Sequence, residues 1–142
     1  MNRRPIILIE DDEDDQFLLH RLLKELDVQN NIRYFANGQQ ALDYLTVTDE
    51  QPFIILCDMN MPVMSGLELR LRIDEDDALR KKAIPFIFLT TDASQQLVKG
   101  AYEATIQGFF KKEGGYSEAK EQLRWIIGYW SHCIHPNNQG WS

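Results

Sequence analysis

The chain has 142 residues, of which 44% are hydrophobic, so it is long enough for one well-buried domain and too short for two ordinary ones. Its 22 acidic side chains outnumber 15 basic ones, and the formal net charge of -7 argues against binding to nucleic acids or anionic membrane surfaces. No apolar segment approaches the roughly 20 residues of a membrane span, and no signal-peptide core is present, so we expect a cytoplasmic protein.

Short apolar runs alternate with segments of helical periodicity along the chain. In chain order, the pattern predicts a strand at 5–9, a helix carrying Leu19, Leu22, Leu23 and Leu26, a strand at 32–35, a helix at 39–47, a strand at 53–57, a helix at 67–73, a strand at 85–89, a helix at 94–104, a strand at 106–110 and a helix at 117–132. Five such alternations are typical of right-handed βαβ units that form a parallel sheet covered on both faces.

The apolar runs differ in how completely they are hydrophobic. Residues 5–9, 53–57 and 85–89 are nearly continuous, which favours strands buried on both faces, whereas 32–35 is more polar and fits a sheet edge. We therefore predict one α/β domain over residues 5–132, followed by a short polar tail over 133–142 and no output domain.

Polar residues follow four of the predicted strands. These residues are Glu10 and Asp11 after the first strand, Asp58 after the third, Thr90 and Thr91 after the fourth, and Lys111 and Lys112 after the fifth. Parallel strands bring their carboxyl ends to one edge of the sheet, where open α/β sheets bind ligands. Clustered carboxylates repel unless a cation neutralises them, and an all-oxygen set with room for waters suits Mg²⁺. Together with an ammonium and a hydroxyl, these groups are suited to phosphoryl transfer.

The pattern resembles the receiver domain of bacterial two-component response regulators, the CheY-like family. The resemblance rests on the acidic pair Glu10-Asp11, on Asp58 followed by Pro62 four residues later, and on Thr90 and Lys112, in this order. It covers about residues 5 to 130 and implies a flavodoxin-like (βα)5 fold with strand order 2-1-3-4-5.

The resemblance also implies a role for each matching position. Asp58 matches the phosphoacceptor, which takes a phosphoryl group from a histidine kinase to give an acyl phosphate. Asp11 matches the direct Mg²⁺ ligand, Glu10 its partner that acts through water, and Asn60 the residue whose backbone carbonyl completes the protein ligands.

Three further positions match the groups that bind and sense the phosphoryl group. Thr90 matches the switch hydroxyl, Lys112 the ammonium that pairs with the phosphoryl oxygens, and Phe109 the aromatic switch residue. Lys111 is excluded as the paired lysine, since the family's aromatic stands three residues before that lysine.

The sequence departs from the family at three positions. Glu113 stands where a proline, usually joined by a cis bond, is expected, so we expect a trans bond after Lys112. Thr91 replaces a small residue beside Thr90 and narrows access to Asp58. Phe109 lacks the hydroxyl of the commoner tyrosine, so it can signal only through packing.

Some residues have simpler explanations. Glu13, Asp14 and Asp15 fit a solvated helix start, where acids complement the helix dipole, and Asp12 stays unassigned. Trp125, Tyr129 and Trp130 fit either core packing or a partner surface.

We therefore expect a stand-alone receiver, which is not an enzyme beyond taking up and releasing its own phosphoryl group. A histidine kinase or phosphotransfer protein and an unknown downstream protein are the expected partners, and the surface of the fourth helix, fifth strand and fifth helix is a candidate dimer contact. One alternative is a Mg²⁺-dependent phosphohydrolase, although its usual second acid is replaced by Asn60. A flavodoxin-like nucleotide binder, disfavoured by acids in its phosphate loop, and a degenerate receiver that binds without phosphorylation are the others.

Overall fold

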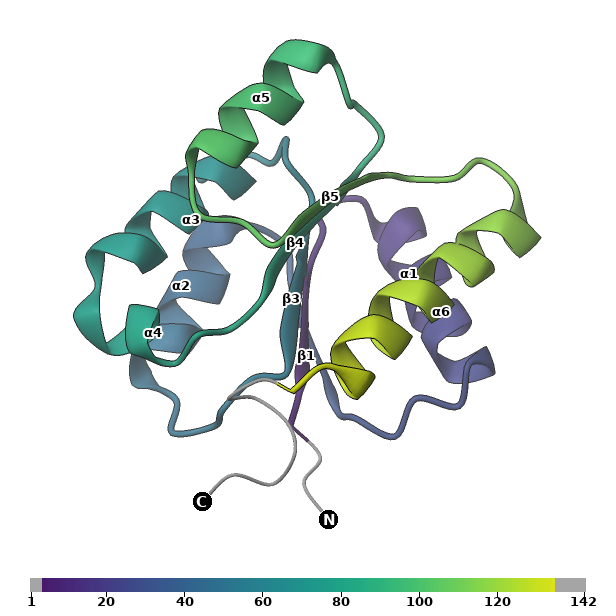
Figure 1. The fold of residues 1–142 in the computed structure, drawn as a ribbon, viewed down its shortest axis with the longest axis horizontal. Coiled ribbons are helices and arrows are strands. Elements are labelled where there is room, and N and C mark those ends of the chain that lie inside the picture. The colour runs from purple at the N-terminus through teal and green to yellow at the C-terminus, as the bar shows by residue number, and fades with distance from the viewer. Residues whose placement is uncertain (1–3, 135–142) are drawn as a thin grey trace.

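The computed structural model describes residues 4–134, which form a five-stranded sheet with helices on both faces (Figure 1). All strand pairs are parallel, and the strand order is β2-β1-β3-β4-β5, which confirms the predicted order and fold class. The strands are β1 (Ile6–Ile9), β2 (Ile32–Phe35), β3 (Ile54–Cys57), β4 (Phe86–Thr90) and β5 (Gly108–Lys111). The predicted tail from residue 135 onward lies outside the described residues.

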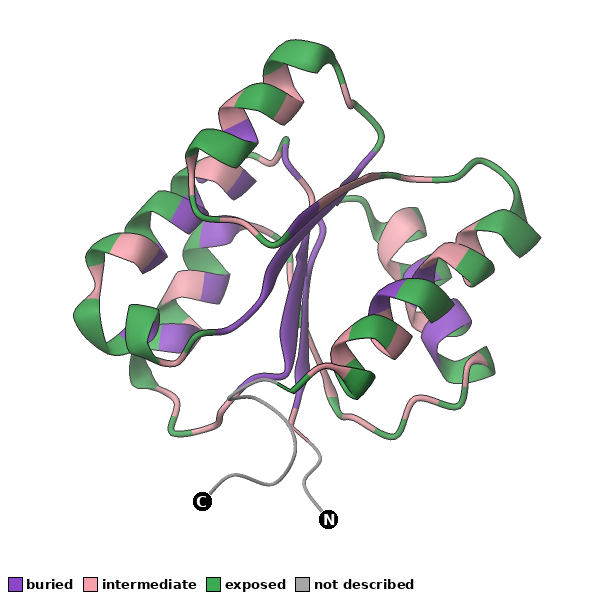
Figure 2. Ribbon diagram, in the orientation of Figure 1, coloured by how far each residue is buried: buried purple, intermediate pink, exposed green. Residues whose placement is uncertain are grey.

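The three central strands are buried along their whole length, as Figure 2 shows in purple. Alternate residues of each strand pack on opposite faces: Ile7 and Ile9 belong to one apolar cluster, and Ile6 and Leu8 to the other. β2 is only partly buried and lies at one edge of the sheet, as its more polar sequence predicts.

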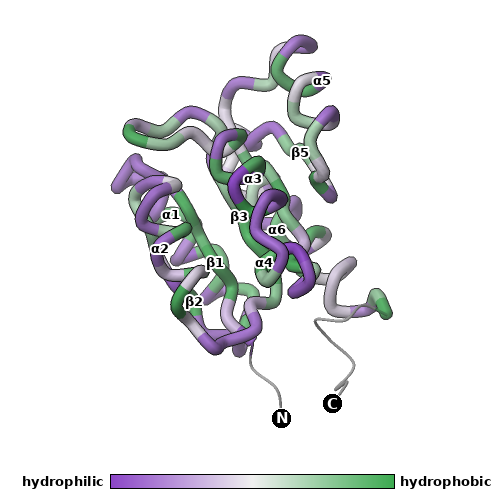
Figure 3. Tube along the Cα trace, turned by 90° about the vertical axis from the view of Figure 1, so that its left-hand side faces the viewer, coloured by the Kyte–Doolittle hydropathy of each residue, from purple (hydrophilic) through white to green (hydrophobic). Residues whose placement is uncertain are grey.

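Helices cover both faces of the sheet and differ in which apolar cluster they complete. The helices are α1 (Glu13–Glu25), α2 (Gly38–Val47), α3 (Gly66–Glu75), α4 (Asp77–Lys81), α5 (Gln95–Glu103) and α6 (Tyr116–His132). α1 and α6 pack on one face, with Leu22 and Ile126 in their shared cluster, and α2, α3 and α5 pack on the other. Figure 3 shows the apolar strands running between helices whose outer turns are hydrophilic.

The short helix α4 was not predicted from the sequence. It lies in the connection between α3 and β4, and Asp76 separates it from α3 while accepting a hydrogen bond from the Leu79 N–H at 3.0 Å. The predicted fourth and fifth helices therefore correspond to α5 and α6. The other predicted helices are present, and their ends differ from the predicted ones by one or two residues. The first helix ends at Glu25, so Leu26, which we predicted to lie in it, is its C-cap.

Side-chain caps explain where several helices begin. Asn37, Ser65 and Ser94 each accept a hydrogen bond from a backbone N–H in the first turn of the following helix. Within residues 4–134, no helix combines the length and apolar character needed to cross a bilayer.

Candidate functional site

Three carboxylates meet where β1 and β3 end. The two strands pair in register up to Ile9 and Cys57, and the Asp58 N–H donates to the Ile9 carbonyl at 2.9 Å, so Glu10 and Asp58 leave the sheet side by side. One carboxylate oxygen from each of Glu10, Asp11 and Asp58 lies within 4.8 Å of the others. The structure thus brings together the side chains that the sequence placed on different strand ends.

Glu10 is the buried member of this cluster, with 3% of its surface exposed. Burial raises its pKa to about 7, because a carboxylate removed from water is disfavoured in its charged form. The hydrogen bond and charge of Lys112 act in the opposite direction, and the Asp58 charge adds to the increase. The charged form of Glu10 is thus disfavoured mainly by burial, and Lys112 offsets only part of this effect.

Lys112 reaches the cluster from the end of β5, at the far side of β4. Its Nζ lies 2.5 Å from Glu10 Oε1 and 2.9 Å from Asp15 Oδ2. Burial acts to lower the Lys112 pKa, but the two hydrogen bonds outweigh it and the pKa is raised, so the group stays an ammonium. Lys111, in contrast, is exposed, and its carbonyl accepts a hydrogen bond from Gln122.

The contact with Asp15 adds a residue that the sequence analysis treated only as part of a solvated helix start. Asp15 does lie in the first turn of α1, and it also pairs with Lys112 there. No spacing in the sequence identifies this contact, since Lys112 lies 97 residues away in the chain.

Thr90 contacts Asp58 directly from the end of β4. Its buried hydroxyl donates to Asp58 Oδ1 at 2.7 Å, and the Met59 N–H donates to the same oxygen at 2.9 Å. No donor among the described residues bonds the second carboxylate oxygen, Oδ2. This oxygen keeps its lone pairs available for a reaction.

Gly66 is a further residue of the site, and the sequence alone assigned it no role. A Cβ at this position would lie 2.4 Å from the Asp58 carbonyl oxygen and 2.6 Å from Phe88 Cε1. The Gly66 N–H donates to the Met59 carbonyl at 2.9 Å. The glycine thus lets the start of α3 pack against the loop that carries Asp58.

Comparison with known proteins agrees with this geometry. The model of the response regulator receiver domain family matches residues 6–124. The chain belongs to this family. Among its relatives, the probable methanogenesis regulatory protein FilR2 of Methanothrix harundinacea is 29% identical over 129 residues, which cover 88% of this chain and 82% of the relative. Sporulation initiation phosphotransferase F of Bacillus subtilis is 29% identical over 126 residues, which cover 87% of this chain and 93% of the relative.

The fold of this receiver matches that of a solved cyanobacterial protein. The phosphorylated phytochrome response regulator RcpA superposes with a TM-score of 0.82 at 24% identity, over 91% of this chain and 94% of that chain. At this identity the likeness supports the fold alone.

Two further predicted site residues lie in the loop after Asp58 and in β5. Asn60 is exposed in the loop after Asp58, and Phe109 is half-buried in β5, where its ring packs against Phe88 with 5.7 Å between ring centroids. The bond after Lys112 is trans, as predicted, since residues 4–134 contain no cis peptide bond. Lys112 reaches Glu10 with Glu113 at the position where the resemblance led us to expect a proline.

Asp12, which the sequence left unassigned, caps a helix. Its Oδ1 accepts hydrogen bonds from the Asp14 N–H at 2.8 Å and the Asp15 N–H at 3.1 Å. Asp12 therefore begins α1 directly beside the acidic cluster and is not one of its clustered carboxylates.

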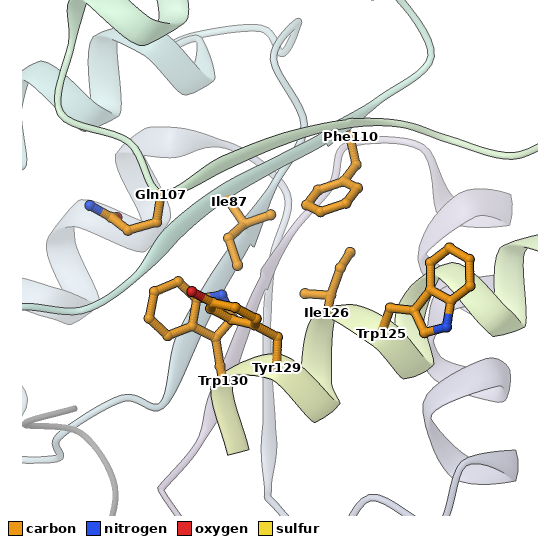
Figure 4. A pocket seen from close by; sticks show the side chains of 7 residues that line it. All are labelled: Ile87, Gln107, Phe110, Trp125, Ile126, Tyr129 and Trp130. Atoms are coloured by element: carbon orange, nitrogen blue, oxygen red, sulfur yellow. The ribbon is translucent and has the colours of Figure 1, made fainter. Parts of the chain in front are cut away.

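The aromatic residues of α6 divide between core and surface. Trp130 packs against the apolar cluster under α1 and α6, whereas Trp125 and Tyr129 are 67% and 65% exposed. Figure 4 shows these rings around a cavity of about 380 Å³ between α6 and strands β4 and β5. Its lining is mostly apolar: Ile87, Gln107, Phe110, Trp125, Ile126, Tyr129 and Trp130. Core packing thus explains Trp130, and the partner-surface interpretation stays a prediction for Trp125 and Tyr129.

Proposed function

We propose that this receiver accepts a phosphoryl group on Asp58 in a Mg²⁺-dependent reaction, with a cytoplasmic histidine kinase or phosphotransfer protein as donor. The observation that carries the proposal is the convergence of Asp58 with Glu10 and Asp11 on one side and with Thr90 on the other. A relative of similar length, the Bacillus subtilis protein, is named a phosphotransferase.

The donor set fits Mg²⁺. Three carboxylate oxygens lie within 4.8 Å of one another, and a hard divalent cation binds an all-oxygen set of this kind. Glu10, Asp11, Asp58 and the backbone carbonyl of Asn60 would hold the ion. When bound, it supplies positive charge to the oxygens of the phosphoryl group.

The reaction itself is a transfer from nitrogen to oxygen. An Asp58 carboxylate oxygen attacks the phosphorus of a phosphohistidine, a P–O bond forms, and the P–N bond breaks to leave the histidine as the departing group. Oδ2 is the attacking atom, because Oδ1 already accepts hydrogen bonds from Met59 and Thr90. The product is an acyl phosphate on Asp58.

Two side chains then respond to the new charge. The Thr90 hydroxyl transfers its hydrogen bond from Asp58 to a phosphoryl oxygen, and the Lys112 ammonium exchanges part of its pairing with Glu10 for the phosphoryl group. Phe109 carries the change toward the surface by repacking, since its ring lies on Phe88, two residues before Thr90.

The surface formed by α5, β5 and α6 is the proposed contact for a downstream protein or a second copy. It exposes Tyr102, Trp125 and Tyr129, of which each is more than half exposed. Large exposed aromatic side chains are typical anchors of protein interfaces. The surface lies beside Phe109 in β5, which connects it with the phosphorylation site.

The test is incubation with Mg²⁺ and acetyl phosphate, followed by measurement of the intact mass. We expect one added phosphoryl group in the wild type and none in Asp58→Asn or in the presence of a chelator. Asp43→Asn, an exposed position on α2, is the matched control and should retain full uptake.

Two results would contradict the proposal. One is a wild-type protein that gains no phosphoryl group under any condition, and the other is an adduct that persists in Asp58→Asn. Repeated turnover of phosphate esters would instead support the phosphohydrolase alternative.

A further inference from the structure

A second cavity lies at the opposite edge of the sheet from Asp58. It has a volume of about 360 Å³ and is enclosed by α3, α4 and the segments that lead into β4 and β5; we refer to it as the α3–α4 cavity. Ile84 and Gln107 line it from positions before those strands begin, whereas Asp58 and Thr90 lie where strands end. Figure 1 shows α4 beside α3 on this side of the molecule.

Arg70 is the buried charge of the α3–α4 cavity. The residue is only 7% exposed, and its guanidinium carbon lies 5.3 Å from the centroid of the Phe86 ring. Nη2 pairs with Asp74 Oδ1 at 3.0 Å, but Nε is buried without a hydrogen-bond partner among the described residues. Burial lowers the pKa of Arg70 although Asp74 acts to raise it, so the one carboxylate leaves the guanidinium incompletely compensated.

The other polar groups of the cavity are mainly donors. Arg80 lines it with a guanidinium that also pairs with Asp77 Oδ1 at 2.7 Å. Gln107 uses its amide oxygen to accept from the Phe86 N–H at 2.6 Å, so its NH₂ group is left to donate. Among the described residues that line the cavity, Asp74 is the sole carboxylate, against two guanidinium groups.

The size and walls of the cavity indicate the kind of anion. Its volume falls within the range of about 300–1,000 Å³ found for small-molecule sites. Ile73, Leu79 and Ile84 supply apolar walls beside the charged groups. A ligand that matches both features has an anionic head and a short apolar body.

We propose that the α3–α4 cavity binds a small organic anion, a carboxylate or a phosphate monoester, whose charged group is held by Arg70 and Arg80. Guanidinium groups suit this role because their planar donors match the paired oxygens of both anions. The site shares no residue with the Asp58 cluster, so it does not depend on the phosphorylation chemistry.

The test follows the arginine Nε–H signals of ¹⁵N-labelled protein by NMR. Butyrate and phenyl phosphate are added separately, with a chelator present and the ionic strength held constant. The Arg70 signal is identified by its loss in Arg70→Lys. We expect the Arg70 signal to shift and saturate. In Arg70→Lys, which keeps the charge but loses the planar guanidinium, binding is followed through the Arg80 signal, and we expect it to be roughly tenfold weaker.

Matched variants keep the test decisive. Arg80→Gln changes a partly exposed residue of α4, so it should fold, and it should bind several-fold more weakly. Arg124→Gln, on α6 and outside the cavity, should bind like the wild type. Asp58→Asn should also bind like the wild type, which separates this site from the proposed phosphoryl acceptor.

Saturation by butyrate alone would assign a carboxylate ligand, and saturation by phenyl phosphate alone a phosphate monoester. The proposal is overturned if neither probe shifts the Arg70 signal. It is also overturned if the Arg70 and Arg80 variants both bind with unchanged affinity.

Discussion

Gly66 occupies a position in the site where a side chain does not fit unless its neighbours move. Its Cα lies so close to the Asp58 carbonyl and the Phe88 ring that a methyl group would overlap both. The first turn of α3 therefore packs directly on the loop between Asp58 and Asn60. That contact fixes the height of the loop above the sheet.

We expect Gly66→Ala to lower the free energy of unfolding by about 1–3 kcal/mol, because the added methyl group must displace backbone. Urea unfolding measures this change, and acetyl phosphate uptake should be slower. Gly100→Ala is the control, since a Cβ there meets nothing within 4 Å, and alanine in α5 should stabilise by up to about 1 kcal/mol. A Gly66→Ala protein as stable as the wild type would contradict the close approach.

Some contacts between residues could be predicted from the sequence, whereas others depend on packing that the sequence alone does not reveal. Glu10, Asp58 and Lys112 could be predicted to meet, because each follows an apolar run and parallel strands end at one edge. Arg70 could not be predicted as buried, because arginine is usually exposed and its neighbours in α3 give no sign of its place over Phe86.

At the scale of elements, the strands and the longer helices could be predicted, with ends that differ by one or two residues from those of the structure. The continuous apolar runs identify β1, β3 and β4, whose two faces both pack against helices. The helix α4 could not be predicted, since its five residues are too few to show a helical period. It forms because Asp76 caps it and Leu79 inserts into the core.

The first helix offers a test of an element-scale interaction. We expect Asp12→Ala to lower the free energy of unfolding by about 1 kcal/mol, because two N–H groups at the start of α1 lose their acceptor. Asp12→Ser should recover most of this loss, since serine also caps helices. Both variants should retain phosphoryl uptake, and a loss of the Mg²⁺-dependent uptake in the stable Asp12→Ser variant would show that Asp12 is a ligand instead.

At the scale of the whole molecule, a few polar contacts add to the apolar clusters in joining neighbouring elements. Glu50, after α2, accepts hydrogen bonds from the Tyr44 hydroxyl and from Arg33 Nη2, the latter at 2.7 Å, and so ties the edge strand β2 to α2. The Arg33 hydrogen bond holds the pKa of Glu50 below its usual value of 4.5.

This pKa shift makes the contribution of Glu50 to stability depend on pH. Because the folded pKa is lower than the unfolded one, the stabilisation is complete above the unfolded pKa and disappears as the pH falls through the folded pKa. We expect the difference in unfolding free energy between wild type and Glu50→Gln to be constant from about pH 7 to about pH 5.5 and to shrink below that. Urea titrations at several pH values measure it, and a difference that stays constant into the acid range would refute the assignment.

The pairing of Glu10 with Lys112 joins residues that are 102 positions apart in the chain. Glu10, Asp11 and Asp58 belong to the first half of the chain, which leaves the ribosome first, whereas Lys112 follows the last strand to be synthesised. A nascent chain that has paired β1, β2 and β3 therefore has its acidic cluster without the ammonium that opposes it. The full set of charges therefore exists only once β5 has paired with β4.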